Sequence, residues 1–182
     1  MNKHLKPVFK VLLPRLEKTG IDYWVYGGIS IAAYVGKFIR KNEDVDIFVK
    51  ESDFQKTKSI LDEMCSRNGF RLINCQPLKR TGRPKLDIKI NRERLSVVPV
   101  YLKNNIVEFK FWKASEEYSH QILEKVERNI SGYRFFSPPN EYIKKLFINY
   151  LTSRKDKKNK PKTRIDAKAI FTLDELVKLN LI

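Results

Sequence analysis

Two aspartates separated by a single residue, Asp44 and Asp46, are the side chains of this sequence best suited to chemistry. They lie at the start of a short apolar run, Val45–Val49, that is typical of a β-strand. Side chains two residues apart in a strand point to the same face, so we expect the two carboxylates to converge. Like charges held together are unfavourable unless a cation lies between them. The pair therefore predicts a divalent-metal site.

A glycine pair, whose second member lies sixteen residues before Asp44, is the other chemical feature. Gly27 and Gly28 end a β-rich run, and Ser30 opens a short amphipathic helix that ends at Val35. Glycines let the backbone approach a ligand closely, and N–H groups at a helix start bind phosphate, which the Ser30 hydroxyl can also contact. Each feature alone is common, as a plain turn or a surface acidic pair. Together they indicate an enzyme that transfers phosphoryl or nucleotidyl groups.

The elements that must position these residues follow from hydrophobic periodicity and turn signals. Helices are predicted at Leu5–Lys18, Ser30–Val35, Ser52–Arg67, Glu141–Thr152, Ile165–Leu173 and Asp174–Asn180, with a weaker helix at Glu116–Glu124. Strands are predicted at Asp22–Tyr26, Val45–Val49, Phe70–Ile73, Lys85–Ile90, Leu95–Leu102 and Ile106–Phe111, the later ones as a meander, with a hairpin over Val126–Phe136. This order predicts an α+β fold, a small mixed β-sheet flanked by helices, with a core over residues 1–136 and a helical C-terminal part over 137–182.

Composition narrows the class of protein and of partner. Hydrophobic residues make up 42% of the 182 residues, which is enough for a packed core. No apolar run is long enough for a membrane span and the first residues do not resemble a signal peptide, so we expect no membrane partner and a cytoplasmic location. Cys65 and Cys75 form no CxxC motif, so a zinc site is not expected. The net charge of +16 favours polyanionic partners, although lysine-rich composition can also reflect genomic base composition.

The stretch Tyr26–Lys50, with GG-x-S, an arginine and then D-x-D before apolar residues, resembles the signature of the DNA polymerase β-like nucleotidyltransferase superfamily. It is most similar to small bacterial members, namely the lincosamide and aminoglycoside nucleotidyltransferases of antibiotic resistance and the nucleotidyltransferase-fold toxins of toxin–antitoxin systems. Arg40 matches the arginine that precedes D-x-D in those subfamilies. In the tail, SPPNEYIKKLF places the family's lysine at Lys145, and KTRIDAKAI matches a late aspartate at Asp166, with Thr163 departing from the usual acid.

The resemblance implies the nucleotidyltransferase fold and a two-metal transfer reaction. An NMP would pass from a nucleoside triphosphate to a hydroxyl of RNA, protein or a small molecule, and pyrophosphate would be released. Asp44 and Asp46 would act as catalytic metal ligands for Mg²⁺ or Mn²⁺. The expected nucleotide-binding residues are Gly27, Gly28, Ser30, Arg40 and Lys145.

The family also needs a third acid on a neighbouring strand, to hold the second metal or to take the proton of the acceptor. Here the sequence departs from the pattern. Ser96 in LSVVPVYL stands where the family's Val-Asp-x-x-Pro has its acid. A hairpin with a two-residue turn at 91–92 would place Asp87 directly across from Ser96, within reach of the same site. Asp87 is therefore the predicted third catalytic acid, and Glu108 is a weaker candidate. The alternative is that Asp87 is an edge-strand acid paired with a nearby lysine.

Two other functions stay open. The Ser96 departure suggests a nucleotide- or nucleic-acid-binding protein on the same fold without catalysis. A basic RNA-binding module is the other, because Ser153–Arg164 carries seven Lys or Arg and one Asp, although such a run is also typical of a surface loop. For a transferase, the charge favours RNA or another polyanionic acceptor, since cationic aminoglycosides need an acidic cleft.

Overall fold

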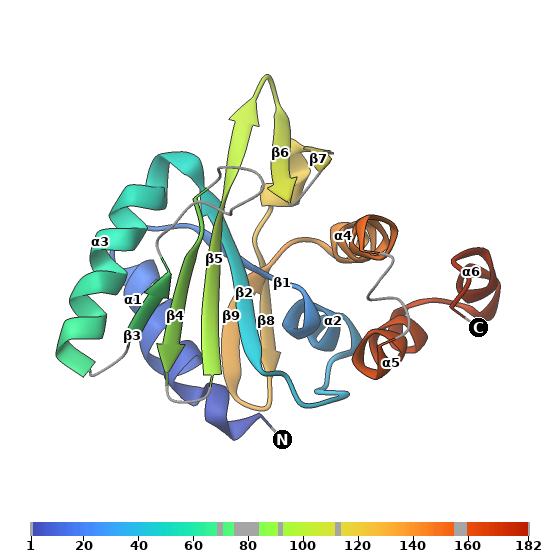
Figure 1. The fold of residues 1–182 in the computed structure, drawn as a ribbon, viewed down its shortest axis with the longest axis horizontal. Helices are drawn as coiled ribbons and strands as arrows, with labels where there is room; N and C mark the ends of the chain where they lie inside the picture. The colour runs from blue at the N-terminus through green and yellow to red at the C-terminus, as the bar shows by residue number, and fades with distance from the viewer. Residues whose placement is uncertain are drawn as a thin grey trace.

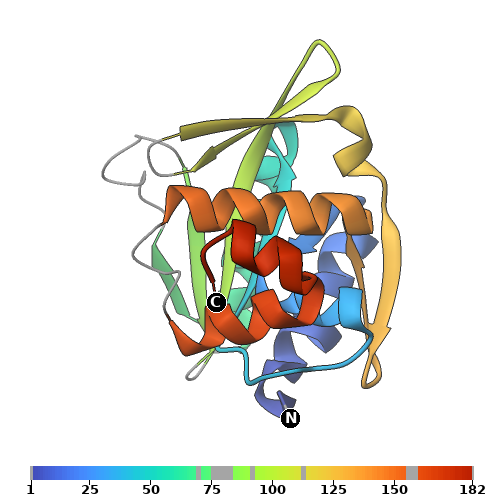
Figure 2. The same ribbon diagram turned by 90° about the vertical axis from the view of Figure 1, so that its right-hand side faces the viewer.

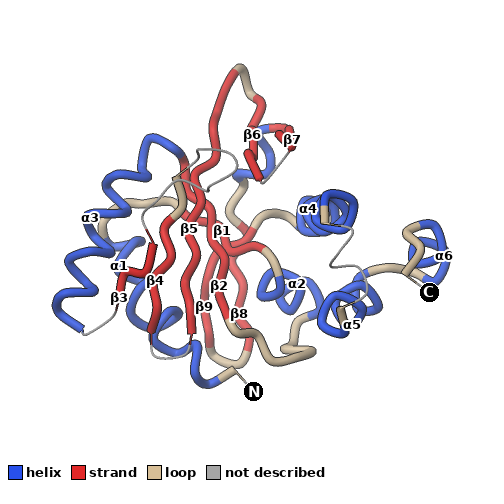
Figure 3. Tube along the Cα trace, viewed as in Figure 1, coloured by secondary structure: helices blue, strands red, loops and turns tan. Residues whose placement is uncertain are grey.

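A computed structural model of the chain describes residues 2–68, 71–74, 84–90, 93–111, 114–154 and 160–181. Within these residues a seven-stranded mixed sheet lies between two groups of helices (Figures 1 and 3). Its strands are β1 (Tyr23–Tyr26), β2 (Asp44–Lys50), β3 (Arg71–Asn74), β4 (Leu86–Ile90), β5 (Glu93–Lys103), β6 (Ile106–Phe111) and β7 (Ala114–Ser119). A separate hairpin of β8 (Val126–Ile130) and β9 (Tyr133–Ser137) packs beside β1.

The strand order β1-β2-β5-β4-β3 has one parallel pair, β2 with β5, and antiparallel pairs elsewhere. The long β5 continues beyond this path, where it pairs with β6, which in turn pairs with β7. The predicted meander from β3 to β6 is therefore confirmed. The meander and the parallel β2–β5 pair together place β5, which carries Ser96, between β2 with Asp44 and Asp46 and β4 with Asp87.

Helices cover both faces of the sheet. On one side lie α1 (Leu13–Lys18), extended at its start by a π-helical stretch over Val8–Leu12, and α3 (Glu51–Asn68). On the other side lie α2 (Gly28–Val35), α4 (Asn140–Ser153), α5 (Pro161–Ile170) and α6 (Leu173–Lys178), and the last three stand in front of the sheet in Figure 2. None of the helices within the described ranges is long and apolar enough to span a membrane.

Strand alternation gives the sheet two different faces. Val45, Ile47 and Val49 of β2 belong to the core that packs under α1 and α3, whereas Phe48 belongs to a second core with Val98, Phe109, Tyr118 and Tyr142. Because alternate side chains point to opposite faces, Asp44 and Asp46 lie on the face of Phe48. The sheet therefore presents its two acids toward α2, α4 and α5.

Most predicted elements are confirmed, with small shifts at their ends. Strand β6 has the predicted bounds, and the β8–β9 hairpin turns at Ser131 and Gly132, whose φ values of 52° and 79° suit a tight two-residue turn. The prediction of a helix over Glu116–Glu124 is wrong, because its first half is β7, paired with β6 along its whole length, and a short 3₁₀ turn follows. Phe70 and Cys75 lie outside the described residues, and Cys65 is buried in the first core.

Candidate active site

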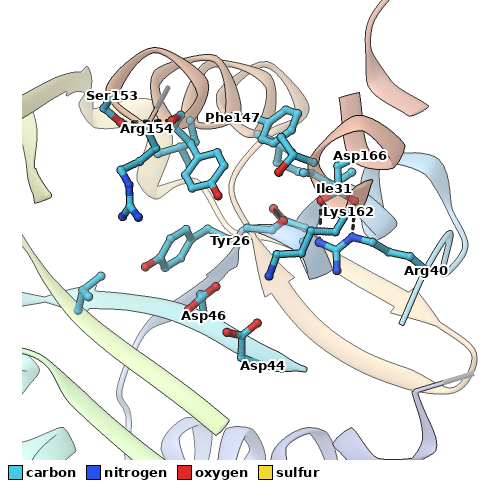
Figure 4. Close-up of a pocket in the computed structure, with 18 of the residues that line it drawn as sticks. Tyr26, Ile31, Arg40, Asp44, Asp46, Phe147, Ser153, Arg154, Lys162 and Asp166 are labelled. Carbon is cyan, nitrogen blue, oxygen red and sulfur yellow. Dashed lines mark hydrogen bonds and ion pairs between the residues drawn. The ribbon is translucent and has the colours of Figure 1, made fainter. Parts of the chain in front are cut away.

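A cavity of about 340 Å³ opens between the acidic sheet face and helices α2, α4 and α5 (Figure 4). Its volume is within the range of small-molecule sites. The polar part of its lining comes from the end of β1, the starts of α2 and β2, helix α5, and side chains of the flanking segments, namely Arg40, Lys85, Arg94, Glu116 and Arg154. Helix α4 supplies an apolar wall, formed by Ile143, Leu146, Phe147 and Tyr150.

The Asp44 and Asp46 side chains both point into this cavity, as their i, i+2 spacing predicts. Asp46 on β2 lies directly opposite Tyr26, the last residue of the antiparallel strand β1. This position places the Asp46 carboxylate against the turn that follows β1. A Cβ atom on Gly27 would lie 3.0 Å from Asp46 Oδ2, and Gly27 has φ 69° and ψ −147°, a conformation almost confined to glycine. Gly27 is therefore needed both for the backbone turn and for the position of the metal-ligand candidate.

Gly28 allows an arginine side chain to lie on the start of helix α2. A Cβ atom there would meet Arg40 Nη2 at 2.3 Å and Asn42 Oδ1 at 2.6 Å. Ser30 lines the cavity but is buried, and its hydroxyl donates to the Gly27 carbonyl at 2.9 Å. In this structure the serine thus braces the glycine turn.

Arg40 forms a bidentate ion pair with Asp166 of helix α5. Arg40 Nε donates to Asp166 Oδ1 at 2.7 Å and Nη2 to Oδ2 at 2.6 Å, with the two side chains 15% and 6% exposed. Burial raises the pKa of Asp166 above its ordinary value although Arg40 acts in the opposite direction. The pair fastens α5 over the glycine turn. Lys162, one helical turn before Asp166, lines the same cavity (Figure 4).

The predicted register of β4 and β5 is confirmed. Asp87 lies directly across from Ser96, and Ser96 lies directly across from Asp46 on the parallel neighbour β2. Ser96 Oγ donates to Asp87 Oδ1 at 2.6 Å, and Lys85 Nζ lies 2.9 Å from the same oxygen. Asp87 is therefore near the acidic pair and is also paired with a lysine. It is 8% exposed and does not line the cavity, whereas Lys85 does.

The other candidate acid, Glu108 on β6, lies away from the site. It accepts from Ser115 Oγ and pairs with Lys110 at 2.5 Å, and it is not among the residues lining the cavity. The fold explains this separation, because β6 pairs with the far half of β5, at Tyr101–Lys103, beyond the Ser96 position.

Comparisons with known proteins can be set against this geometry. The model of the aminoglycoside-2''-adenylyltransferase family matches residues 8–76, the segment from the first helix through β3. The antibiotic-resistance factor ANT(2'')-Ia in solution matches with a TM-score of 0.67 at 17% identity, over 98% of this chain and 90% of that one. The chain has the fold of the small bacterial nucleotidyltransferases.

Two further solved structures support the same nucleotidyltransferase fold. ANT(2'')-Ia in complex with adenylyl-2''-tobramycin has a TM-score of 0.63 at 18% identity, over 92% of this chain and 90% of that one. Lincomycin-bound LnuA, a lincosamide antibiotic adenylyltransferase, has a TM-score of 0.60 at 15% identity, over 87% and 91%. A search of curated proteins gave no match. The predicted nucleotidyltransferase fold and α+β class are confirmed.

Within this nucleotidyltransferase fold, the structure places Lys145 away from the predicted nucleotide site. Its side chain is 56% exposed, lies 4.0 Å from Glu141 and stands over the Tyr142 ring at 4.7 Å. Positions 143, 146, 147 and 150 lie on the side of α4 that faces the cavity. Lys145 lies on a different side of the helix because of the helical period of 3.6 residues. Among the residues that the structure describes, the lysines lining the cavity are Lys85 and Lys162.

The acidic pair has the electrostatics of a cation site. Burial, and then the neighbouring Asp44 carboxylate, raise the pKa of Asp46 to about 7, while Lys85 and Arg94 act in the opposite direction. Ionised Asp46 is thus unfavourable here without additional positive charge. Two converging carboxylates with hard oxygen donors fit Mg²⁺, which takes few protein ligands and completes its shell with water and phosphate oxygens. No cluster of three or more such ligands occurs in the described part of the chain.

Glu116 is a cavity residue that the sequence reasoning missed. Tyr118 Oη donates to Glu116 Oε2 at 2.7 Å, and Asn149 Nδ2 of α4 donates to Tyr118 Oη at 2.7 Å. This relay fixes a carboxylate beside the apolar wall of α4. The segment ASEEYS is ambiguous between helix and strand in the sequence, and its pairing with β6 as a strand is what puts Glu116 and Tyr118 on one face.

Proposed function

We propose that this protein is a metal-dependent nucleotidyltransferase that acts in the cytoplasm and moves an NMP from a nucleoside triphosphate to an acceptor hydroxyl. The observation that carries the proposal is the convergence of Asp44 and Asp46 beside the Gly27–Gly28 turn, inside the cavity of a nucleotidyltransferase fold. A site of this kind needs a phosphate-binding backbone and a seat for a divalent ion within reach of each other. The start of α2 and the Asp44–Asp46 pair line the same cavity, which supports giving them these two roles.

Different cavity residues would bind the metal ion, bind the phosphates and hold helix α5 in place. Asp44 and Asp46 would hold Mg²⁺ or Mn²⁺, which when bound supplies positive charge to the triphosphate. The N–H groups at the start of α2 and the Lys162 ammonium bind phosphate oxygens, and Arg40 keeps α5 in place. The acceptor oxygen gives its proton to water and bonds to the α-phosphorus. The bond from that phosphorus to the bridging oxygen breaks, and pyrophosphate leaves.

For the acceptor we propose a small molecule of the antibiotic kind as the first class to test. The cavity beside the metal site has an apolar wall from α4 and one fixed carboxylate, Glu116, a combination suited to a molecule with apolar groups and a hydroxyl or amine. The matched structures hold adenylyl-2''-tobramycin or lincomycin. RNA is the second acceptor class, because the net charge is +16 and the basic Arg154 and Lys162 face the cavity.

The test is transfer of label from each α-³²P-labelled NTP, with Mg²⁺, to aminoglycosides, lincosamides or total RNA. We expect transfer to one of these classes by the wild type and a loss of about 100-fold or more in Asp46→Asn. Glu43→Gln, which alters an exposed acid one residue before Asp44, is the matched control and should keep full activity. Labelled RNA would point to a toxin-like role, and a labelled antibiotic to resistance.

Ser96 favours a second candidate function, nucleotide binding without transfer. The neutral serine stands at the position opposite Asp46, where the family has an acid. Under this alternative, calorimetry would show Mg²⁺-dependent NTP binding that Asp46→Asn abolishes. No label would reach any acceptor.

A further inference from the structure

We propose that this active site is built for a single divalent ion, and that Lys85 and Arg94 stand where a two-metal enzyme has its second ion. This inference rests on the proposed function, because it concerns the ions that accompany the nucleotide. It departs from the two-metal arrangement that the fold family implies, since the residues needed to hold a second ion are either absent or already engaged.

The position opposite Asp46 lacks a ligand for a second ion. Ser96 occupies it, is fully buried, and uses its hydroxyl proton in the 2.6 Å hydrogen bond to Asp87 Oδ1. A neutral hydroxyl is a much weaker ligand for Mg²⁺ than a carboxylate. The strand β5 therefore contributes a hydrogen-bond donor where a metal ligand is required.

Asp87, the nearest remaining acid, is held by two cations. Its Oδ1 atom receives the Ser96 hydroxyl, lies 2.9 Å from Lys85 Nζ and lies 3.9 Å from Arg94 Nε. Its side chain is 11% exposed, against 19% for Lys85 and 44% for Arg94. Lys85 and Arg94 line the cavity and Asp87 does not, so the two cations stand between this acid and the cavity.

Arg94 also reaches the acidic pair itself. Its Nη2 atom donates to Asp44 Oδ2 at 3.0 Å, from the residue directly opposite Asp44 on β5. One guanidinium thus touches both Asp44 and Asp87, leaving little room between them for an ion that must contact both. The three carboxylates and two cations leave one net negative charge, which suits one divalent ion with its nucleotide and disfavours a second.

The two side-chain cations also supply what a second ion would contribute to the reaction. A fixed ammonium and guanidinium at the cavity wall offer positive charge to an acceptor oxygen as it develops negative charge. Unlike an ion, they are always present, so the site needs to recruit only the cation that arrives with the triphosphate.

The test counts Mn²⁺ by electron paramagnetic resonance, using the full chain and an equal concentration of an NTP analogue with a methylene bridge between the α- and β-phosphates. We expect one Mn²⁺ per chain in the wild type. In Lys85→Gln/Arg94→Gln/Ser96→Asp, which removes both cations and restores an acid opposite Asp46, we expect two. Lys89→Gln, which removes an exposed charge on β4, is the control and should still bind one.

Each result is decisive. Two Mn²⁺ in the wild type would overturn the single-ion inference and leave the proposed function intact. One Mn²⁺ in the triple variant, with thermal unfolding showing a folded protein, would show that the two cations are not what excludes the second ion. No nucleotide-dependent Mn²⁺ binding in the wild type would overturn the inference together with the proposed function.

Discussion

The buried pair of Arg40 and Asp166 allows a stability prediction worked directly from the structure. Its side chains are 15% and 6% exposed and meet through two hydrogen bonds of 2.6 and 2.7 Å. Asp166→Ala would leave the Arg40 guanidinium buried without its counter-charge, and breaking such a pair costs about 3–5 kcal/mol. Because Arg40 keeps partial access to solvent and donates to the Lys41 carbonyl, we expect a value near the lower end, about 3 kcal/mol.

Urea unfolding gives the free energy of unfolding of each variant. Asp22→Ala is the matched control, because Asp22 pairs with Lys125 at 2.7 Å through side chains that are 40% and 34% exposed. Exposed ion pairs contribute little to stability, so Asp22→Ala should lower the free energy of unfolding by less than about 1 kcal/mol. For a chain of this length, a loss of 3 kcal/mol corresponds to a Tm lower by about 6–12 °C.

The double variant Arg40→Met/Asp166→Leu separates the ion pair from simple packing. Burial raises the pKa of Asp166 even with Arg40 beside it, so the cost of desolvating the two charges offsets much of their Coulomb attraction. Replacing both partners should therefore cost clearly less than Asp166→Ala alone. Our reasoning is refuted if Asp166→Ala costs no more than Asp22→Ala, or if the double variant is the less stable of the two.

Three further predictions concern the cavity. Because the pKa of Asp46 is raised from 3.8 to about 7, the contribution of Asp46 to the free energy of unfolding is complete below pH 3.8 and is lost as the pH rises through about 7. In EDTA, Asp46→Asn should remove this part of the pH dependence of unfolding. A pH profile that is the same in the variant and the wild type would contradict the prediction. Gly27→Ala should cost about 1–3 kcal/mol and weaken Mn²⁺ binding, whereas Gly36→Ala, strained but in open space, should leave Mn²⁺ binding unchanged. Lys162→Ala should raise the KM for NTP about tenfold, whereas Lys145→Ala should not, and the reverse order would restore the original assignment to Lys145.

Local rules and turn geometry made much of the site predictable. A two-residue turn fixes the register of its hairpin, so Asp87 could be placed across from Ser96 without any knowledge of the rest of the fold. The alternation of a strand fixed the common face of Asp44 and Asp46 in the same way. Both inferences depend only on residues within one or two adjacent elements.

Residues distant in the chain were harder to place, because tertiary packing decides their orientation. The partner of Arg40 lies 126 residues away, and only the resemblance suggested that Asp166 had a role. The pattern of apolar residues along α4 indicates which side of the helix is buried, but not which part of the protein packs against it. Lys145 was therefore assigned to the nucleotide site, although the structure places it on an exposed side of α4. Glu116 was missed because the short segment ASEEYS fits helix and strand about equally until its pairing with β6 is known.

The central claim is that Asp44 and Asp46 carry a metal-dependent nucleotidyl transfer. The most direct measurement is the rate of pyrophosphate release from NTP, with Mg²⁺ and the acceptor that becomes labelled, for the wild type, Asp44→Asn, Asp46→Asn and Glu43→Gln. We expect release by the wild type and Glu43→Gln, no release in EDTA, and a loss of about 100-fold or more in both aspartate variants. Release that persists at the wild-type rate in either aspartate variant would contradict the claim.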